Sequence, residues 1–328
     1  MADIFLQDDA LKCLRGKSVV FLGDSIMRNI YQDFVTLLFT GKMSSHEHVL
    51  KKKGEMIPRY YGDRLVPGTG RLTKGRDFRE ERETRMDKEN LVLRYYFLTQ
   101  CWNSEVKKYL ERSRRYRDPD LILVLSCLWD VNRWGPGGIK NYKANCEDLL
   151  RYVRKEMSNS TQLVWLTCPP ISTEVRGGVV VDGMDVRGMR FNVMEANLMV
   201  AANTAAHGYD VLDLHYHMMH QVHKRMPDGV HWTQAAVRFQ VNHILTHWCL
   251  SRDLPLPRRD RSSYVTAARK MSDAAEEGPV NFVKQDLNGN DSNKRKKDSL
   301  EVPFPKKSKL DETKKGEEEE GHSNQLRK

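Results

Sequence analysis

Five short apolar runs, each followed by a helix-like stretch, constrain the fold of this chain more than any other feature. Their Val, Ile, Leu and aromatic residues are nearly continuous, which is typical of strands buried on both faces of a sheet. The runs are "SVVFLG" (18–23), "LVLRYYFL" (91–98), "LILVLSCLW" (121–129), "QLVWLTC" (162–168) and "YDVLDL" (209–214). Helices are predicted over 27–39, 104–116, 139–157, 187–206 and 233–250. This alternation predicts an α/β fold with a mostly parallel sheet between two layers of helices.

Two segments depart from this pattern. Residues 40–90 are rich in charge and long for a loop, so we interpret them as a partly ordered insertion. The end of the chain, 252–328, has few aromatic or β-branched residues and contains the blocks "KRKK", "PKKSK" and "EEEE". Such a composition buries too little apolar surface to offset the entropy of ordering. We therefore expect one folded domain over 1–251 and a disordered basic and acidic tail over 252–328.

The two basic blocks of the tail resemble a bipartite nuclear-import signal, which makes an import receptor a candidate partner. The alternative is a solvated charged tail. The formal net charge of +10 permits affinity for nucleic acid. No nucleic-acid motif accompanies it, and the aromatic residues fall mostly within the apolar runs, so we expect no specific nucleic-acid partner.

The N-terminus lacks the pattern of a signal peptide, and no apolar run reaches membrane-spanning length. These features predict a soluble protein without a membrane span, cytoplasmic, nuclear or both. The six cysteines form no Cys-x-x-Cys pair and are expected to be free thiols. The histidines of "HYHMMHQVH" lack an accompanying carboxylate, so we predict neither a metal site nor a cofactor.

Ser25 ends the tripeptide Gly23-Asp24-Ser25, which closes the first predicted strand. One interpretation makes Ser25 an ordinary helix N-cap, because serine is favoured at that position. The other makes it a nucleophile, because ligands of parallel α/β sheets bind at the carboxyl ends of the strands.

The stretch "DGVHW" favours the second interpretation. A hydroxyl is a weak nucleophile at neutral pH and needs a base within hydrogen-bond reach, and that base needs a carboxylate to fix its tautomer. Asp228 and His231, three residues apart just before the last predicted helix, supply both groups. An Asp that only forms a turn before the helix is the alternative.

Together these elements resemble the SGNH (GDSL-type) hydrolase superfamily, in which Gly-Asp-Ser follows the first strand and Asp-x-x-His precedes the last helix. More narrowly, "VFLGDSIMRNIYQD", "LILVLSCLWDVNRWG" and "YDVLDLHYHMMHQVHKRMPDGVHW" look like the PC-esterase domain-containing family, also called FAM113. The resemblance covers about residues 10–250. It implies a flavodoxin-like three-layer α/β/α fold with a five-stranded sheet, and an acyl esterase acting on ester-modified carbohydrate or lipid.

The resemblance also implies roles for single residues. Ser25 would be the nucleophile, His231 the general base and Asp228 the group that orients His231. The remaining candidates, as oxyanion-hole or substrate-lining residues, are Gly23, Asp24, Trp129, Asp130, Asn132 and Arg133.

The family pattern Gly-x-Asn-Asp is replaced here by "LWDVNRWG". The glycine that would donate a further backbone N–H to the oxyanion is therefore unassigned, with Gly54 and Gly62 as candidates. Two hypotheses follow. The first is an acyl-ester hydrolase, or an acyltransferase if a sugar hydroxyl replaces water. The second is a catalytically silent relative that binds a ligand or a protein.

Overall fold

The computed structural model describes residues 2–44, 62–70, 75–135, 137–176 and 186–258, together with 262 and 266. The basic and acidic blocks of the predicted tail lie outside the described residues. Gly54, one of the two glycines considered for the oxyanion hole, lies outside them as well.

The described strands form one seven-stranded sheet in the order β2-β3-β4-β1-β5-β6-β7. The strands are β1 (Ser18–Gly23), β2 (Arg64–Leu65), β3 (Glu81–Met86), β4 (Leu91–Phe97), β5 (Leu121–Leu125), β6 (Gln162–Leu166) and β7 (Asp210–Leu212). β4, β1, β5, β6 and β7 are parallel, and β3 and β2 extend the sheet antiparallel beyond β4. The parallel strands follow the flavodoxin-like order, so the predicted fold class is confirmed.

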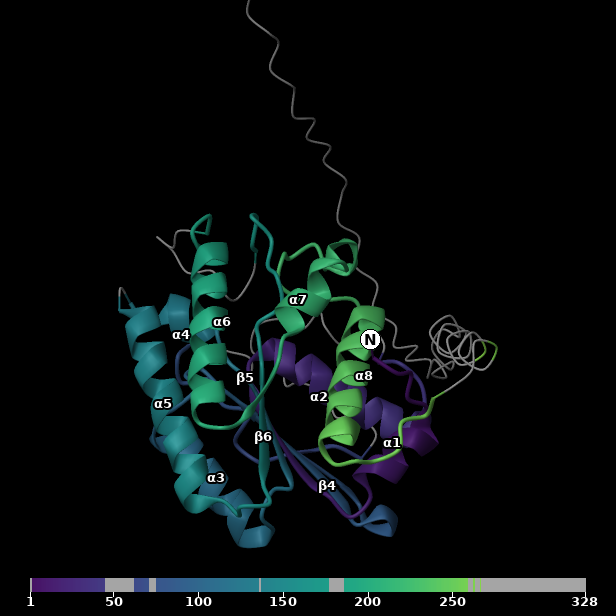
Figure 1. The fold of residues 1–328 in the computed structure, drawn as a ribbon. Coiled ribbons are helices and arrows are strands. Elements are labelled where there is room, and N and C mark those ends of the chain that lie inside the picture. The colour runs from purple at the N-terminus through teal and green to yellow at the C-terminus, as the bar shows by residue number, and fades with distance from the viewer. Residues whose placement is uncertain are drawn as a thin grey trace, which may run out of the picture. The chain divides into compact units, whose positions relative to one another are not determined.

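Helices cover both faces of this sheet (Figure 1). On one side lie α1 (Gln7–Leu14), α2 (Ser25–Thr40) and α8 (Gln234–Ser251), which contact one another. On the other side lie α3 (Ser104–Tyr116), α4 (Leu128–Arg133), α5 (Gly138–Glu156) and α6 (Met189–Ala206). The shorter elements are α7 (Leu214–Met219) and the 3-10 turns η2 (Asp87–Glu89) and η3 (Val222–Lys224). The result is the three-layer α/β/α arrangement.

The structure corrects the sequence-based prediction in two places. The sheet has seven strands instead of five, because β2 and β3 lie within the charged segment 40–90. The apolar run 121–129 is not one strand: β5 ends at Leu125 and α4 begins at Leu128. A buried helix and a buried strand give the same apolar pattern over so few residues, so periodicity alone did not separate them.

Buried ion pairs attach the antiparallel extension to α2. Arg82 is 1% exposed and pairs with Asp63 and with Glu80, and Glu80 also accepts a hydrogen bond from Arg28 at 2.8 Å. Tyr31 of α2 donates to Asp63 at 2.8 Å. Ion pairs thus take the place of apolar contacts between this extension and α2, so the sequence shows no apolar periodicity there. Each buried charge has a partner of opposite sign.

The chain reverses the direction of its winding at β1, because β4 lies on one side of β1 and β5 on the other. Ligands of such sheets bind at the carboxyl end of the strand where this reversal occurs. Gly23 ends β1 there, in a crowded position. A Cβ at Gly23 would lie 2.4 Å from Leu125 O and 2.4 Å from the Cβ of Met27. Glycine therefore allows β1 to approach β5 and the first turn of α2 closely.

We predict that Gly23→Ala lowers the free energy of unfolding by about 1–3 kcal/mol, because the added methyl overlaps a backbone oxygen that cannot move freely. Urea unfolding would measure the change. Gly137→Ala is the matched control, since the nearest atom to its added Cβ is the amide nitrogen of Asn141 at 3.4 Å. Equal stability of Gly23→Ala and the unsubstituted protein would contradict the close approach.

Candidate active site

Ser25 is the first residue of α2 and follows the carboxyl end of β1. The N-cap is Asp24, whose side chain accepts a hydrogen bond from the backbone N–H of Ile26 at 2.8 Å. The interpretation of Ser25 as the capping residue is therefore wrong. Because Asp24 caps the helix, the half-buried hydroxyl of Ser25 is available to another partner at the positive end of the helix dipole.

The segment Asp228–His231 forms a tight turn before α8. The carboxylate of Asp228 accepts hydrogen bonds from the backbone N–H groups of Val230 and His231, both at 2.9 Å. Gly229 adopts a φ of 80° and packs against the loop after β6, where a Cβ would lie 2.4 Å from Glu174 O. Ser172 and Arg176 of that loop donate backbone hydrogen bonds to the turn. The turn is therefore held by its own Asp228 carboxylate and by the loop after β6.

The structure brings Ser25, His231 and Asp228 into one hydrogen-bonded row. The Nε2 of His231 lies 2.7 Å from the Oγ of Ser25, and its Nδ1 lies 2.6 Å from Oδ2 of Asp228. Because a carboxylate only accepts, Nδ1 carries the proton and donates to Asp228. Nε2 is then free to accept the hydroxyl proton of Ser25.

The carboxylates near Ser25 have different environments. Burial raises the pKa of Asp228, but the hydrogen bond and charge of His231 and two backbone N–H bonds outweigh it and lower this pKa to about 2. Burial raises the pKa of Asp24 to about 6, against the backbone hydrogen bond of Ile26 and the charges of His231 and Arg28. Asp228 is thus ionised at neutral pH.

Asp130, predicted at the substrate or oxyanion site, is instead a buried connecting group. It is 2% exposed and accepts hydrogen bonds from the backbone N–H of Cys101 at 2.8 Å and from the Ser126 hydroxyl. Burial raises its pKa to about 7, although these hydrogen bonds lower it. Asp130 joins the loop after β4 to the start of α4, so its carboxylate reaches no open surface.

Asn132 and its neighbours lie on α4. The Asn132 side-chain amide donates to Leu128 O at 3.0 Å, which leaves one amide hydrogen for another acceptor. The guanidinium carbon of Arg133 lies 4.1 Å from the centre of the Trp129 ring. Trp129 packs edge-on against Phe97, with ring centroids 5.4 Å apart. Trp129 and Arg133 are 7% and 6% exposed, so both are part of the buried packing around Phe97.

The two glycines considered for the oxyanion hole do not fill that position. Gly62 lies against the ring of Phe39, which would be 3.4 Å from an added Cβ, near the end of α2 opposite to Ser25. At 1.5 Å of rise per residue this end is about 20 Å from Ser25. The assignment of Gly62 is therefore wrong, and Gly54 lies outside the described residues.

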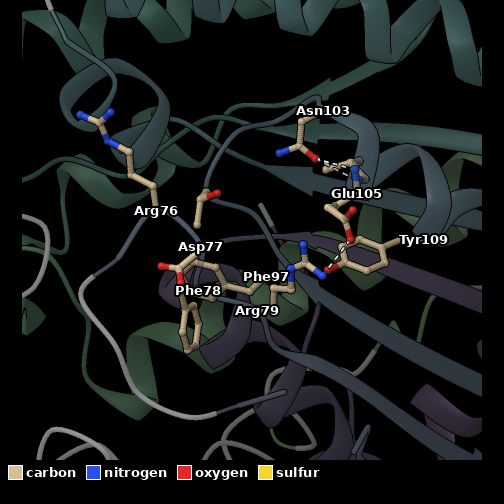
Figure 2. Close-up of a pocket in the computed structure, with 10 residues that line it drawn as sticks. Arg76, Asp77, Phe78, Arg79, Phe97, Asn103, Glu105 and Tyr109 are labelled. Carbon is tan, nitrogen blue, oxygen red and sulfur yellow. Dashed lines mark hydrogen bonds and ion pairs between the residues drawn. The ribbon is translucent and has the colours of Figure 1, made fainter. Parts of the chain in front are cut away.

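Sequence reasoning missed a small hollow at the end of β4 (Figure 2). Its volume is about 80 Å³, and it is lined by Phe97, the register partner of Gly23, together with Phe78, Arg79 and Tyr109. Arg79 pairs with Glu105 at 3.0 Å across it. Because β3 runs antiparallel to β4, the residues before β3 lie at the carboxyl edge of the sheet. No apolar pattern in the charged segment indicated this placement.

Within the described residues, no group of three or more His, Cys, Asp or Glu side chains is arranged to hold a metal ion. His215 contacts Cys168 O at 2.9 Å, and His217 packs on His243 with ring centroids 4.2 Å apart. All six cysteines are free and buried. None of the helices in the described part of the chain is long and apolar enough to cross a membrane.

No protein-family model matches the chain. It is similar to PC-esterase domain-containing protein 1A of Mus musculus, with 34% identity over 261 residues, covering 78% of this chain and 58% of the relative. Similarity to PC-esterase domain-containing protein 1B of Homo sapiens is 34% over 252 residues, covering 75% and 57%. The chain thus spans somewhat more than half the length of these relatives.

Solved structures resemble it more distantly. A lipase/acylhydrolase from Enterococcus faecalis has 13% identity and a TM-score of 0.42, covering 74% of this chain and 99% of that one. The acetyl xylan esterase AlAXEase has 11% identity and a TM-score of 0.43, covering 70% and 98%.

The raised pKa of Asp130 predicts a pH dependence of stability. Because its folded-state pKa is about 7 and its ordinary value is 3.8, its contribution is fully present below about pH 4 and is lost as the pH rises through about 7. Asp130→Asn keeps a neutral acceptor for Cys101 at every pH. We expect its free energy of unfolding to fall less than that of the unsubstituted protein across this window.

Urea unfolding at a series of pH values would measure both curves. Asp118→Asn is the control, because the side chain of Asp118 is 48% exposed. Parallel curves for Asp130→Asn and the unsubstituted protein would show that Asp130 titrates normally in the folded state.

Proposed function

The chain belongs to the family of PC-esterase domain-containing proteins, and from this premise we propose that it is a serine-dependent carboxylic-ester hydrolase. Ser25 is the proposed nucleophile, His231 the general base and then acid, and Asp228 the group that orients His231. The observation that carries the proposal is the unbroken hydrogen-bonded row from Ser25 Oγ through the imidazole to Asp228.

In the first step, Ser25 Oγ attacks the carbonyl carbon of the ester while its proton passes to Nε2 of His231. The imidazolium that forms is stabilised by Asp228, whose low pKa keeps it a carboxylate at neutral pH. Asp228 also holds Nδ1 protonated beforehand, because it lies 2.6 Å away as an acceptor. The histidine therefore begins the step with its lone pair on Nε2.

In the second step, the tetrahedral intermediate collapses and its C–O bond to the leaving alcohol breaks. His231 returns the proton from Nε2 to that alcohol, and the acyl group stays on Ser25. Water then attacks the acyl-enzyme, again giving its proton to Nε2, and the carboxylic acid leaves with Ser25 restored. A sugar hydroxyl in place of water would make the same cycle an acyl transfer.

The oxyanion of these intermediates needs hydrogen-bond donors, each worth about 3–4 kcal/mol in comparable sites. The backbone N–H of Ser25 at the start of α2 is the first proposed donor. The second is the free amide hydrogen of Asn132, which α4 holds near the carboxyl end of β5. Gly23 contributes by keeping β1 close to β5.

The proposed substrate is an ester on a small molecule, a glycan or a lipid. The hollow of about 80 Å³ beside Phe97 would hold only a small group, such as a short acyl chain or part of a sugar. Its aromatic rings and its charged groups, Arg79 and Glu105 among them, suit a polar substrate with an apolar face.

We predict that Ser25→Ala and His231→Ala each lower kcat for p-nitrophenyl esters by about 10³-fold or more, because each removes a member of one catalytic unit. Hydrolysis would be measured for esters from acetate to octanoate. A fluorophosphonate probe should label the unsubstituted protein and spare Ser25→Ala. Ser160→Ala, an exposed serine in the turn after α5, is the matched control.

Equal labelling of Ser25→Ala and the control would contradict the assignment of the nucleophile. The competing function is a silent member of the family that binds a ligand or a protein. It is favoured by the bond of Asn132 to Leu128 O, which occupies part of the proposed oxyanion donor. A folded protein with neither turnover nor labelling would support that function instead.

The variant Asp228→Asn tests whether Asp228 orients the His231 imidazole, without removing the turn that Asp228 forms. The asparagine fits the same turn and still accepts the backbone hydrogen bonds, but its amide favours the wrong imidazole tautomer. We expect kcat to fall by about 10²–10⁴-fold while the midpoint of thermal unfolding changes little at neutral pH. Unchanged kcat would show that His231 does not depend on Asp228.

A further inference from the structure

A second hollow, of about 260 Å³, lies on the face of the sheet that α3 covers only in part. β2, β3 and β4 form its floor, and the carboxyl-terminal half of α3 forms one wall. We name it the arginine hollow after its charged lining. Five arginines line it, of which Arg64, Arg85, Arg94 and Arg112 pair with Glu81 or Glu83, and two tyrosines, Tyr96 and Tyr116, lie beside them.

The carboxylates of the hollow balance only part of this charge. Three arginines share the single carboxylate of Glu83: Arg64 and Arg85 bind its Oε1 at 2.8 Å, and Arg94 binds its Oε2 at 3.0 Å. Arg112 binds Glu81 at 2.6 Å. Among the residues that the structure describes in this lining, four guanidinium groups thus face two carboxylates, an excess of two positive charges.

Arg82 also borders the hollow, but it does not alter this balance. Its guanidinium is fully buried and pairs with Asp63 and Glu80, which are themselves fully buried. Glu83 is ionised in this setting. Burial raises its pKa, but the hydrogen bond of Arg85 and the charges of Arg94 and Arg85 outweigh burial and lower it below the ordinary value.

Most of the guanidinium donors make no hydrogen bond to another described residue. A guanidinium carries five N–H donors in a planar fork, and the hydrogen bonds given above use one or two from each of the four arginines. Arg94 adds one long bond, 3.4 Å, to the hydroxyl of Ser18. Arg94 is 4% exposed, so its orientation is fixed by packing, whereas Arg64, Arg85 and Arg112 are about half exposed or more.

We propose that the arginine hollow binds the phosphate groups of a small anionic molecule. Arginine forks match the oxygen geometry of phosphate bidentately, and a dianion would balance the excess of two positive charges. The ring of Tyr116 lies 5.8 Å from the guanidinium carbon of Arg94 and closes one side. A bounded hollow suits a small anion, whereas a nucleic-acid backbone needs a charged stripe that follows several phosphates.

Titration calorimetry of the full chain with inorganic pyrophosphate tests this proposal. We expect saturable binding of one pyrophosphate per chain. Arg112→Gln and Arg64→Gln, both at exposed side chains, should each weaken it by about tenfold, as expected for the loss of a charge-assisted hydrogen bond. Arg94→Gln should weaken it at least as much.

Arg151→Gln is the matched control, because Arg151 is an exposed arginine of α5 that bridges Glu147 and Asp148. Sodium chloride at equal ionic strength separates specific binding from screening. Vesicles of phosphatidylserine separate a free phosphate compound from a lipid headgroup, and only the former is expected to bind.

The proposal is overturned if pyrophosphate gives no saturable heat, if all variants bind like Arg151→Gln, or if only the vesicles bind. Thermal unfolding of each variant without ligand shows whether it is folded. If Arg94→Gln does not fold, the exposed variants decide the result. The outcome is independent of ester hydrolysis, since neither Ser25 nor His231 lies in this hollow.

Discussion

The parallel pairing of β1 between β4 and β5 is the constraint on which the rest of the site depends. It places the carboxyl end of β1 where the winding of the sheet reverses. Gly23, which has no Cβ, allows the first turn of α2 to pack closely against this end of β1. Ser25 then lies at the edge where the loops of several strands meet. The turn Asp228–His231 reaches the same edge from the far end of the chain, because α8 packs on α2.

An apolar core holds most elements of this protein together, but the antiparallel extension is joined to α2 by buried ion pairs. The alternating row Arg28, Glu80, Arg82 and Asp63 joins α2 to β3 inside the protein, and no charge in it lacks an opposite partner. Such networks are costly to desolvate, and removing one member leaves the others unpaired. Glu83 of the same strand β3 binds the exposed Arg64 and Arg85 and the buried Arg94. The charged segment thus supplies both a buried network and part of the lining of the arginine hollow.

Three aspartates of the site region differ in pKa because their surroundings differ. Asp24 and Asp130 are buried with few donors, so burial raises the pKa of each, to about 6 and about 7. Asp228 is partly exposed and accepts bonds from His231 and two backbone N–H groups, which lower its pKa to about 2. The same side chain thus serves as a helix cap, a buried link between loops, and a permanent carboxylate beside an imidazole.

The sequence by itself determined the parallel core and the three residues of the row. Buried strands and amphipathic helices leave periodic apolar patterns, and Gly23-Asp24-Ser25 and Asp228-x-x-His231 are local motifs at strand and helix ends. It did not determine β2, β3 or the hollow beside Phe97, because these depend on ion pairs such as Arg82 with Asp63 that carry no periodicity. It also placed Asp130 at the site, where only tertiary packing shows that its carboxylate faces Cys101 and Ser126. Motifs fix which residues stand at the end of an element, but the direction and burial of a side chain are set by contacts between distant segments, and only the tertiary structure decides those.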